Sequence, residues 1–318
     1  MTAPEKAARV RRLAKQAGFD RVGIAQAGPI TRADYLRAWL DRGWAGRMDY
    51  LHRHFDRRTD PGVLLPGARS VIVVALNYHQ QAPNRPEHPP TGQIAMYAWG
   101  DDYHRVVKNR LLEMIDALRT QIDEPFQAKA CVDTAPILER EWAAASGVGW
   151  IGKNTLALHQ DLGSYFFLGE IVTTLELPPD PPATDHCGSC TRCLDACPTQ
   201  AFPAPYRMDA SRCISYLTIE LRDAIPAEFH GPMGDWVFGC DVCQQVCPHN
   251  HRAPLSTAFT PRPPSPYPVL EEVLQWTPQD YSANLSHSPI KRAKLPMLKR
   301  NATIAQSNAI KAHSASDG

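Results

Sequence analysis

Eight of the nine cysteines in this 318-residue chain lie in or near two short runs, and their spacing predicts metal chemistry. The first run, C-G-S-C-T-R-C-L-D-A-C-P, contains Cys187, Cys190, Cys193 and Cys197. This is the C-x2-C-x2-C-x3-C-P spacing of bacterial proteins that carry two iron–sulfur clusters. The first three thiolates wrap one cluster, whereas the fourth precedes a proline that turns the chain and ligates a second cluster. The run therefore predicts two [4Fe–4S] clusters.

The second run, G-C-D-V-C-Q-Q-V-C-P, completes the two sets of ligands. It contains Cys240, Cys243 and Cys247. The eighth candidate ligand, Cys213, lies some distance upstream. By the crossing rule of two-cluster ferredoxins, one cluster binds Cys187, Cys190, Cys193 and Cys247. The other cluster binds Cys197, Cys213, Cys240 and Cys243.

Zinc sites and disulfides are the alternatives for these cysteines. Paired zinc ribbons need neither a crossed fourth cysteine nor a trailing proline. Disulfides are disfavoured because the N-terminus carries no secretory signal, and we expect a protein of the reducing cytoplasm. The ninth cysteine, Cys131, is expected to be a lone buried thiol.

Asp133 is a further residue whose position suggests chemistry. It follows A-K-A-C-V, which we expect to be a strand, and precedes T-A-P-I-L-E-R-E, which we expect to begin a helix. The carboxyl ends of strands commonly carry catalytic groups in α/β layers. The same arrangement also suits a helix cap, because aspartate or threonine before proline is common where helices begin. The residues alone leave both roles open.

Hydrophobic periodicity predicts the elements that position these residues. Residues 70–78 are apolar and rich in β-branched side chains, which predicts a buried central strand. Another strand is expected at residues 163–171, and a proline-rich linker at 178–182 marks the first domain boundary. A long helix is expected before Asp133, with a core face of Val106, Val107, Leu111, Leu112, Ile115 and Leu118. A last helix with Leu298, Ala302, Ala305 and Ala309 on one face should dock onto the body or begin a repeat array.

Composition excludes some classes of protein and the charge pattern suggests one partner. No apolar run approaches the roughly 20 residues that span a bilayer, so no membrane partner is expected. The net charge of +1 is uninformative, but residues 282–311 contain no acidic residue. Six basic residues lie there: Lys291, Arg292, Lys294, Lys299, Arg300 and Lys311. Such a cluster suits a phosphate backbone, although a solvated helix face would show the same pattern. The glycine-rich stretch G-V-G-W-I-G-K-N-T matches no nucleotide-binding fingerprint.

Seven ordered segments make the chain resemble the epoxyqueuosine reductase family, the cobalamin and iron–sulfur enzymes that complete queuosine synthesis on tRNA. They are L-L-P-G-A-R-S-V-I-V-V-A-L-N-Y, Y-A-W-G-D-D-Y-H, V-D-T-A-P-I-L-E-R, G-W-I-G-K-N-T, G-S-Y-F-F-L-G-E-I, R-C-I-S-Y-L-T-I-E and G-C-D-V-C-Q-Q-V-C-P. The resemblance covers nearly the whole chain. Many family members continue into a helical-repeat domain of HEAT type.

The resemblance implies an α+β protein in three parts. Residues 1–178 would form a mixed α/β cobalamin-binding catalytic domain on a nitroreductase-like scaffold. Residues 179–255 would form a ferredoxin-like domain with two [4Fe–4S] clusters. Residues 256–318 would be a proline-rich and helical segment, the truncated start of a HEAT-like domain.

The resemblance also implies the reaction and the partners. The epoxide of epoxyqueuosine at the tRNA wobble position would be reduced to queuosine with the help of cobalamin and the two clusters. An external donor, such as a flavodoxin or ferredoxin system, would supply electrons to a cytoplasmic monomer. The histidine signature of B12 proteins, D-x-H-x-x-G, is missing here, so a corrinoid would have no such ligand on the lower face of cobalt.

The resemblance assigns roles to particular residues. Asp133 matches the family's proton donor, and burial in a corrinoid-covered pocket should raise the pKa of its carboxyl group. The implied corrinoid contacts are Arg57, Tyr97, Asp133, Asn154, Leu158, Leu168, Ser215, Cys240 and Asp241. The candidate tRNA contacts are Arg222, Lys291, Arg292, Lys299 and Arg300.

Three alternative functions compete with this interpretation. A corrinoid reductive dehalogenase would share the cofactors but would use a tyrosine as proton donor and usually carry a twin-arginine signal, whose apolar core is missing from residues 1–12. A non-catalytic electron-transfer protein would leave the corrinoid pocket empty. A tRNA-binding or corrinoid-trafficking protein would not turn over epoxyqueuosine.

Overall fold

A four-stranded antiparallel sheet forms the centre of the N-terminal half. A computed structural model describes residues 1–262 and 264–316. The strands are β1 (Arg21–Gln26), β2 (Ser70–Asn77), β7 (Phe166–Thr173) and β4 (Ala128–Cys131), in the order β1-β2-β7-β4. All eight residues of β2 are buried between β1 and β7, which confirms the predicted central strand.

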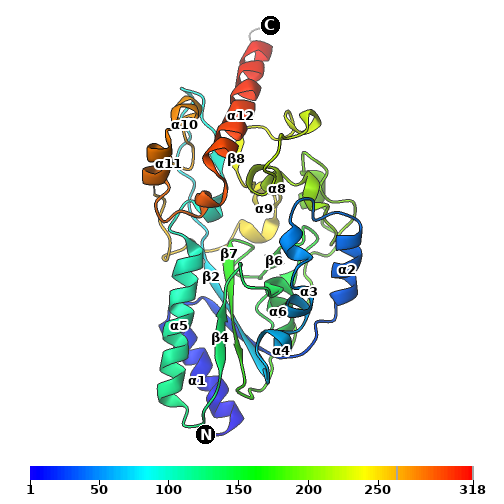
Figure 1. Ribbon diagram of the computed structural model, residues 1–318, viewed down its shortest axis with the longest axis vertical. Helices are drawn as coiled ribbons and strands as arrows, with labels where there is room; N and C mark the ends of the chain where they lie inside the picture. The colour runs from blue at the N-terminus through cyan, green and yellow to red at the C-terminus, as the bar shows by residue number, and fades with distance from the viewer. Residues whose placement is uncertain (263, 317–318) are drawn as a thin grey trace.

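Helices cover both faces of this sheet (Figure 1). Residues of α1 (Ala3–Gln16) and α5 (Tyr103–Gln121) pack with Ile72, Val74 and Ile171 on one face. Short helix α6 (Glu139–Ala145) packs on the other face against the alternate residues of the same strands. The predicted core face of α5 is wrong at Leu112, whose side chain is 45% exposed, because the apolar stripe runs through Met114 instead.

Three more short helices extend the N-terminal half. They are α2 (Ala33–Asp41), α3 (Phe55–Thr59) and α4 (Pro61–Leu64). A small hairpin of β5 (Trp150–Ile151) and β6 (Ala157–Leu158) precedes β7. The lone thiol Cys131 is fully buried at the end of β4, as predicted.

The cysteine runs lie in a region of short elements. It contains α7 (Arg192–Asp195), α8 (Ile214–Ile219), β8 (Trp236–Phe238) and α9 (Val242–Gln245). Strand β8 pairs in parallel with β3 (Gln93–Ile94), which ties this region to the N-terminal half. Single 3-10 turns occur at Asp49–Leu51, Met96–Ala98, Ala210–Arg212, Ala227–Phe229, Pro248–Asn250 and Pro289–Arg292.

The C-terminal helices pack onto the body. They are α10 (Leu270–Gln275), α11 (Pro278–Asn284) and α12 (Leu295–Ser316). Leu298, Ala302 and Ala305 of α12 are buried, and α12 contacts α10, β8 and α8. Buried Asn301 donates its amide N–H groups to the carbonyls of Thr218 and Val237. The last helix therefore docks, as its apolar face predicted.

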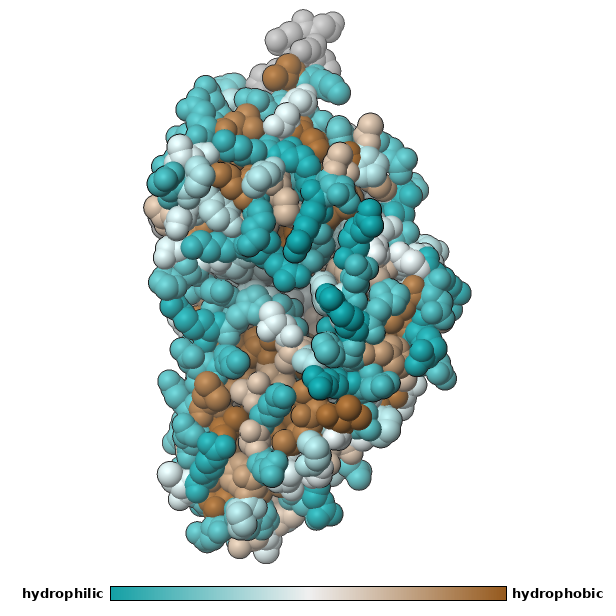
Figure 2. Space-filling model, in the orientation of Figure 1, coloured by the Kyte–Doolittle hydropathy of each residue, from teal (hydrophilic) through white to brown (hydrophobic). Residues whose placement is uncertain are grey.

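The arrangement is a mixed α/β body, which confirms the predicted α+β class. Figure 2 shows that hydrophilic side chains cover most of this face of the molecule and border a hollow at mid-height. Within the described part of the chain, no helix is both long and apolar enough to span a membrane.

Candidate functional site

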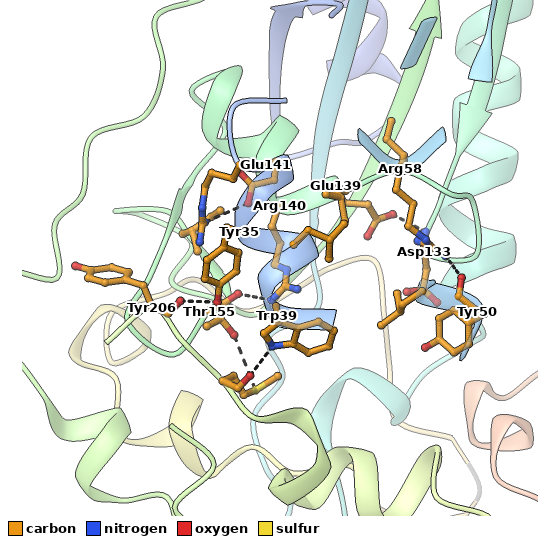
Figure 3. Close-up of a pocket in the computed structure, with 17 residues that line it drawn as sticks. Tyr35, Trp39, Tyr50, Arg58, Asp133, Glu139, Arg140, Glu141, Thr155 and Tyr206 are labelled. Atoms are coloured by element: carbon orange, nitrogen blue, oxygen red, sulfur yellow. Dashed lines mark hydrogen bonds and ion pairs between the residues drawn. The ribbon is translucent and has the colours of Figure 1, made fainter. Parts of the chain in front are cut away.

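A cavity of about 400 Å³ lies between the start of α6, helix α2 and the loop after the first cysteine run. In Figure 3, Tyr50, Arg58, Asp133 and Glu139 occupy one end. The other end holds Tyr35, Trp39, Arg140, Glu141, Thr155 and Tyr206. The lining thus joins the segment around Asp133 to the cysteine-bearing region.

Helix α2 is held against the cysteine-bearing region by two aromatic side chains. The Trp39 Nε1–H group donates to the Met208 carbonyl at 2.6 Å, and the Tyr35 hydroxyl donates to the Tyr206 carbonyl at 3.0 Å. These bonds join positions about 170 residues apart in sequence. They fix one wall of the cavity.

Asp133 lies two residues beyond β4 in an unusual backbone conformation. Its φ is 44°, in the left-handed region that aspartate and asparagine tolerate better than most residues. Its N–H donates to Oε1 of Glu139. Helix α6 begins only at Glu139, and its N-cap, Leu138, makes no side-chain capping bond. The helix-cap interpretation of Asp133 is therefore wrong, and its carboxyl group is free for another role.

His104 bridges two carboxylates, one of which, on Asp133, lines this cavity. Its Nε2 lies 2.8 Å from Oδ2 of Asp133, and its Nδ1 lies 2.7 Å from Oδ1 of Asp102. Asp102 also caps α5 by accepting from the His104 N–H. The ring of the neighbouring Tyr103 stacks on Phe167 at 4.2 Å, which anchors the start of this helix on the sheet.

This bridge determines the charge on both groups. Burial opposes the imidazolium, but the hydrogen bonds and charges of Asp102 and Asp133 outweigh it and raise the pKa of His104 to about 9. Burial also favours neutral Asp133, but the hydrogen bond and charge of His104 dominate and lower its pKa. The predicted upward shift concerns Asp133 covered by a corrinoid and stays a prediction; the sequence did not reveal that His104 is its neighbour and lowers this pKa. Near neutral pH, Nε2 of His104 therefore carries the proton and donates it in a hydrogen bond to Oδ2 of the Asp133 carboxylate.

Two acids with raised pKa values, half-buried Glu139 and fully buried Glu170, lie near Asp133. Burial and the charge of Asp133 raise the pKa of Glu139 to about 8. Glu170, fully buried in β7, has its pKa raised far above the usual range by burial and by Glu139. Neither carboxyl oxygen of Glu170 has a hydrogen-bond partner within the part of the chain described. Both acids therefore retain their protons near neutral pH.

Sequence reasoning selected Arg57, but the structure places its neighbour in the cavity. Arg58 is 8% exposed and lines the cavity, whereas the side chain of Arg57 is exposed. The guanidinium of Arg58 lies 5.9 Å from the centre of the Tyr50 ring, and that of Arg292 lies 5.6 Å from it. Consecutive arginines give no periodicity that could have chosen between them.

The other implied corrinoid contacts lie outside this cavity. Of that set, Asp133 is the member that lines it among the residues described. Tyr97 packs 6.1 Å from Tyr103, and burial followed by the charges of Asp133 and Asp241 raises its pKa. Asp241 accepts from the Met96 N–H at 2.6 Å, and burial raises its pKa to about 7.

The remaining members are divided between the sheet and the cysteine-bearing region. Asn154 and Leu158 are buried in and beside the β5–β6 hairpin, and Leu168 is buried in β7 on the face that α6 covers. Ser215 is half-buried in the first turn of α8, and Cys240 immediately precedes Asp241.

The thiols of the cysteine runs are described by their two predicted ligand sets, with Cys187, Cys190, Cys193 and Cys247 as the first group and the other four as the second. Burial and the charges of Cys247, Cys187 and Cys190 raise the pKa of Cys193 to about 11. Burial, followed by the charges of neighbours that include Cys213 and Cys197, raises the pKa of Cys240. Burial, followed by the charges of Cys213 and Cys240, likewise raises the pKa of Cys243, to which Cys193 of the other set also contributes. All eight cysteines are free of disulfides, and their division into two crossed sets stays a prediction.

The candidate tRNA contacts differ in how much of their charge is available. Lys291 and Arg222 are exposed, and Lys299 is half-buried. Arg292 binds both carboxyl oxygens of Glu220, at 2.9 and 3.1 Å. Arg300 donates to the carbonyls of Leu217, Leu221 and Asp223. It therefore ties α12 to the end of α8.

Two protein-family models match the chain. The model described as "Epoxyqueuosine reductase QueG, DUF1730" matches residues 58–134, which include Arg58, His104 and Asp133. The model described as "4Fe-4S double cluster binding domain" matches residues 186–250, which include all eight cysteines of the two groups.

Known proteins resemble the chain over most of its length. An epoxyqueuosine reductase of Cellulophaga algicola is 43% identical over 290 residues, which are 89% of this chain and 92% of that protein. The crystal structure of a selenomethionine-labelled epoxyqueuosine reductase is 31% identical with a TM-score of 0.90, covering 96% of this chain and 82% of that one. An epoxyqueuosine reductase solved with an epoxyqueuosine-modified tRNA-Tyr stem loop is 31% identical with a TM-score of 0.89, covering 96% and 81%.

Proposed function

This chain belongs to the epoxyqueuosine reductase family, and we propose that it reduces the epoxide of epoxyqueuosine in tRNA to the alkene of queuosine. The relative solved with a modified tRNA stem loop supports tRNA as the substrate. The observation that carries the proposal is the Asp133–His104 pair, in which a proton donor is bonded to a carboxyl group that lines a cavity. Membership of this family disfavours the alternative interpretation of the chain as a reductive dehalogenase.

The residues of this chain fit two [4Fe–4S] clusters. The chain supplies eight free thiols, which is the number of donors that two such clusters require, and the family model that matches this region is that of a double-cluster domain. We assign one cluster to Cys187, Cys190, Cys193 and Cys247. We assign the other to Cys197, Cys213, Cys240 and Cys243.

The residues also fit cobalamin, whose rim carries many amide groups. Beside those of Trp142 and Glu170, the buried polar atoms without a partner among the described residues are Nε of Arg58, Oε1 of Gln80 and Oδ1 of Asp241. Buried polar groups are normally satisfied, so these atoms are suited to a large polar ligand. Together with the predicted contacts, they are the residues that would hold the corrinoid. When bound, cobalamin and the clusters supply the two electrons that the reduction consumes.

The protein's own part in the reaction is to deliver protons. Converting an epoxide to an alkene and water consumes two electrons and two protons. Asp133 transfers the shared proton to the epoxide oxygen as a carbon–oxygen bond breaks, and His104 supplies that proton from Nε2. Because the pKa of His104 is about 9, the imidazolium is populated at neutral pH. Half-buried Glu139 holds a further proton beside Asp133.

The partners and organisation follow from the same proposal. A one-electron carrier of the flavodoxin or ferredoxin type reduces the clusters, and the protein works as a cytoplasmic monomer. The exposed basic residues near the C-terminus, among them Lys291, contact tRNA phosphates. Residues 1–178, 179–255 and 256–318 form the catalytic, cluster-binding and C-terminal parts.

Expression in a bacterium that lacks its own epoxyqueuosine reductase tests the proposal. Nucleosides from total tRNA should change from epoxyqueuosine to queuosine when this chain is produced. The Asp133→Asn variant, produced at the same level, is the matched control and should leave epoxyqueuosine unchanged. Persistent epoxyqueuosine in cells whose protein carries both kinds of cofactor would overturn the proposed activity.

A further inference from the structure

The β5–β6 hairpin brings a tryptophan N–H group against one cysteine of the first group. Nε1 of Trp150 lies 3.5 Å from Sγ of Cys187, within the reach of an N–H···S hydrogen bond. Trp150 is buried, and His186 and His249 contact its ring edge-to-face, each at 5.0 Å between centres. Gly152 allows the hairpin to pack closely, because a β-carbon there would overlap Cδ1 of Leu158.

The same hairpin places a buried cation beside this group. Lys153 is 8% exposed, and its ammonium group donates to the carbonyls of Gly188 at 2.6 Å and Cys190 at 2.9 Å. Within the described part of the chain, no carboxylate forms an ion pair with it. Its positive charge is therefore directed at the loop that carries Cys187 and Cys190.

Both features favour the reduced form of a cluster held by these thiolates. A cluster with four thiolate ligands is an anion, and one-electron reduction adds a further negative charge. A hydrogen bond to a ligand sulfur and a nearby cation stabilise that added charge, and hydrogen bonding, net charge and exposure set the potentials of such clusters. A buried cation acts more strongly than an exposed one, because solvent screens it less.

We propose that Trp150 and Lys153 raise the reduction potential of the cluster bound by Cys187, Cys190, Cys193 and Cys247, so that this cluster accepts the electron from the external carrier. The step oxidises the carrier by one electron, reduces the cluster by one electron and moves no proton. This inference rests on the proposed cluster ligation and is independent of the tRNA substrate. It gives the G-W-I-G-K-N-T stretch a role, which its sequence alone did not reveal.

The exposure of the surrounding loop is consistent with electron entry at this cluster. His186, Ser189, Thr191 and Arg192 all have exposed side chains. Electron transfer from a carrier requires close approach to the cluster. This exposed loop carries three cysteines of the first group, so a carrier that binds to it would lie near the cluster.

A redox titration followed by electron paramagnetic resonance tests the proposal on anaerobically purified protein without tRNA. Trp150→Phe keeps the ring but removes the N–H donor, and Lys153→Met keeps the length of the side chain but removes its charge. We expect each variant to lower the midpoint potential of one cluster and to leave the other unchanged. For Lys153→Met, we expect about a tenfold fall in the equilibrium constant for reduction, which is about 59 mV for one electron.

Two further variants separate tuning from structure. Lys153→Arg keeps the positive charge and should retain a potential close to that of the parent. Arg212→Gln alters a side chain that donates to the Thr199 carbonyl, beside the second group of thiols, and should leave the first cluster's potential unchanged. If Lys153→Met loses iron, the midpoint potentials of Trp150→Phe test the proposal instead. Unchanged midpoints in Trp150→Phe with full iron content would overturn the proposal, whereas a parent protein without clusters would overturn the ligation itself.

Discussion

Replacing Asp133 with asparagine removes the carboxylate that relays the proton of His104 while keeping the shape of the side chain. The backbone φ of 44° at this position suits asparagine about as well as aspartate, whereas alanine would be strained there. No helix cap is lost, because the N-cap of α6 is Leu138. The amide oxygen of asparagine can still accept the hydrogen bond from Nε2 of His104.

The structure indicates a small cost in stability and a large cost in activity. The side chain of Asp133 is 51% exposed, so its screened pair with His104 contributes about 0–1 kcal/mol to the free energy of unfolding. A loss of 1 kcal/mol lowers the Tm of a protein of 150–250 residues by about 2–4 °C. General acid catalysis contributes roughly 10²–10⁴-fold, or about 2.7–5.4 kcal/mol at 1.36 kcal/mol for each factor of ten.

The assay compares Asp133→Asn with the parent in a single turnover on tRNA that carries epoxyqueuosine, under excess reductant. Nucleoside analysis by mass spectrometry should show at least a hundredfold slower formation of queuosine. Iron content, cobalamin content and Tm should remain close to those of the parent. Normal turnover by this variant would refute the role of Asp133 in proton delivery, and loss of cobalamin would assign the residue to binding instead.

Asp102→Asn is a matched control on the other side of the imidazole. Asparagine caps a helix about as well as aspartate, so α5 keeps its cap. One of the two negative charges that raise the pKa of His104 is lost, so this pKa should fall from about 9 towards its ordinary value of 6.5. Because His104 then loses its proton at a lower pH, the alkaline limb of the pH–rate profile should move to lower pH. An unmoved limb would contradict the role of His104 as the proton source.

Three other predictions concern the clusters, tRNA binding and stability. Cys247→Ala should destroy the electron paramagnetic resonance signal of the cluster bound by the first cysteine run; loss of the other signal alone would contradict the crossed ligation. Replacing exposed Lys291 and Lys294 with glutamate should weaken tRNA binding and reduce the slope of the logarithm of the binding constant against the logarithm of salt concentration by about 2. The control Lys15→Glu on α1 should change neither the affinity nor the slope. An unchanged slope in the double variant would indicate that these lysines are only solvated. The folded-state pKa of Glu170 lies above its ordinary value of 4.5, so neutral Glu170 contributes stability at low pH that is lost as pH rises above that value. The Tm of Glu170→Gln relative to that of the parent should therefore increase between about pH 5 and pH 8. A constant difference in Tm would show that Glu170 does not remain neutral in the folded protein.

Local features of this protein could be predicted from its sequence. The apolar run at residues 70–78 identified β2, because a strand buried on both faces requires a continuous apolar stretch. The spacing of the cysteines predicted a double-cluster region, which the matching family model confirms, since ligand spacing within a short loop is a local property. The apolar face of the last helix likewise predicted its docking.

Contacts between distant segments could not be predicted in this way. His104 and Asp133 are 29 residues apart, and the packing of α5 against β7 and β4 brings the imidazole to the carboxyl group. Without that neighbour, the sequence suggested the effect of burial on the pKa of Asp133 but not the opposing effect of His104. The bond between Trp150 and Cys187 spans 37 residues and depends on the fold of a two-stranded hairpin. No periodicity encodes such pairs.

The most direct test of this account is anaerobic conversion of epoxyqueuosine to queuosine in tRNA by the purified chain carrying both clusters and cobalamin. With a low-potential reductant, we expect one queuosine to form for each pair of electrons consumed, and none to form when cobalamin is left out. Conversion that proceeds equally well without cobalamin, or no conversion by protein with a full complement of iron and cobalamin, would contradict the account.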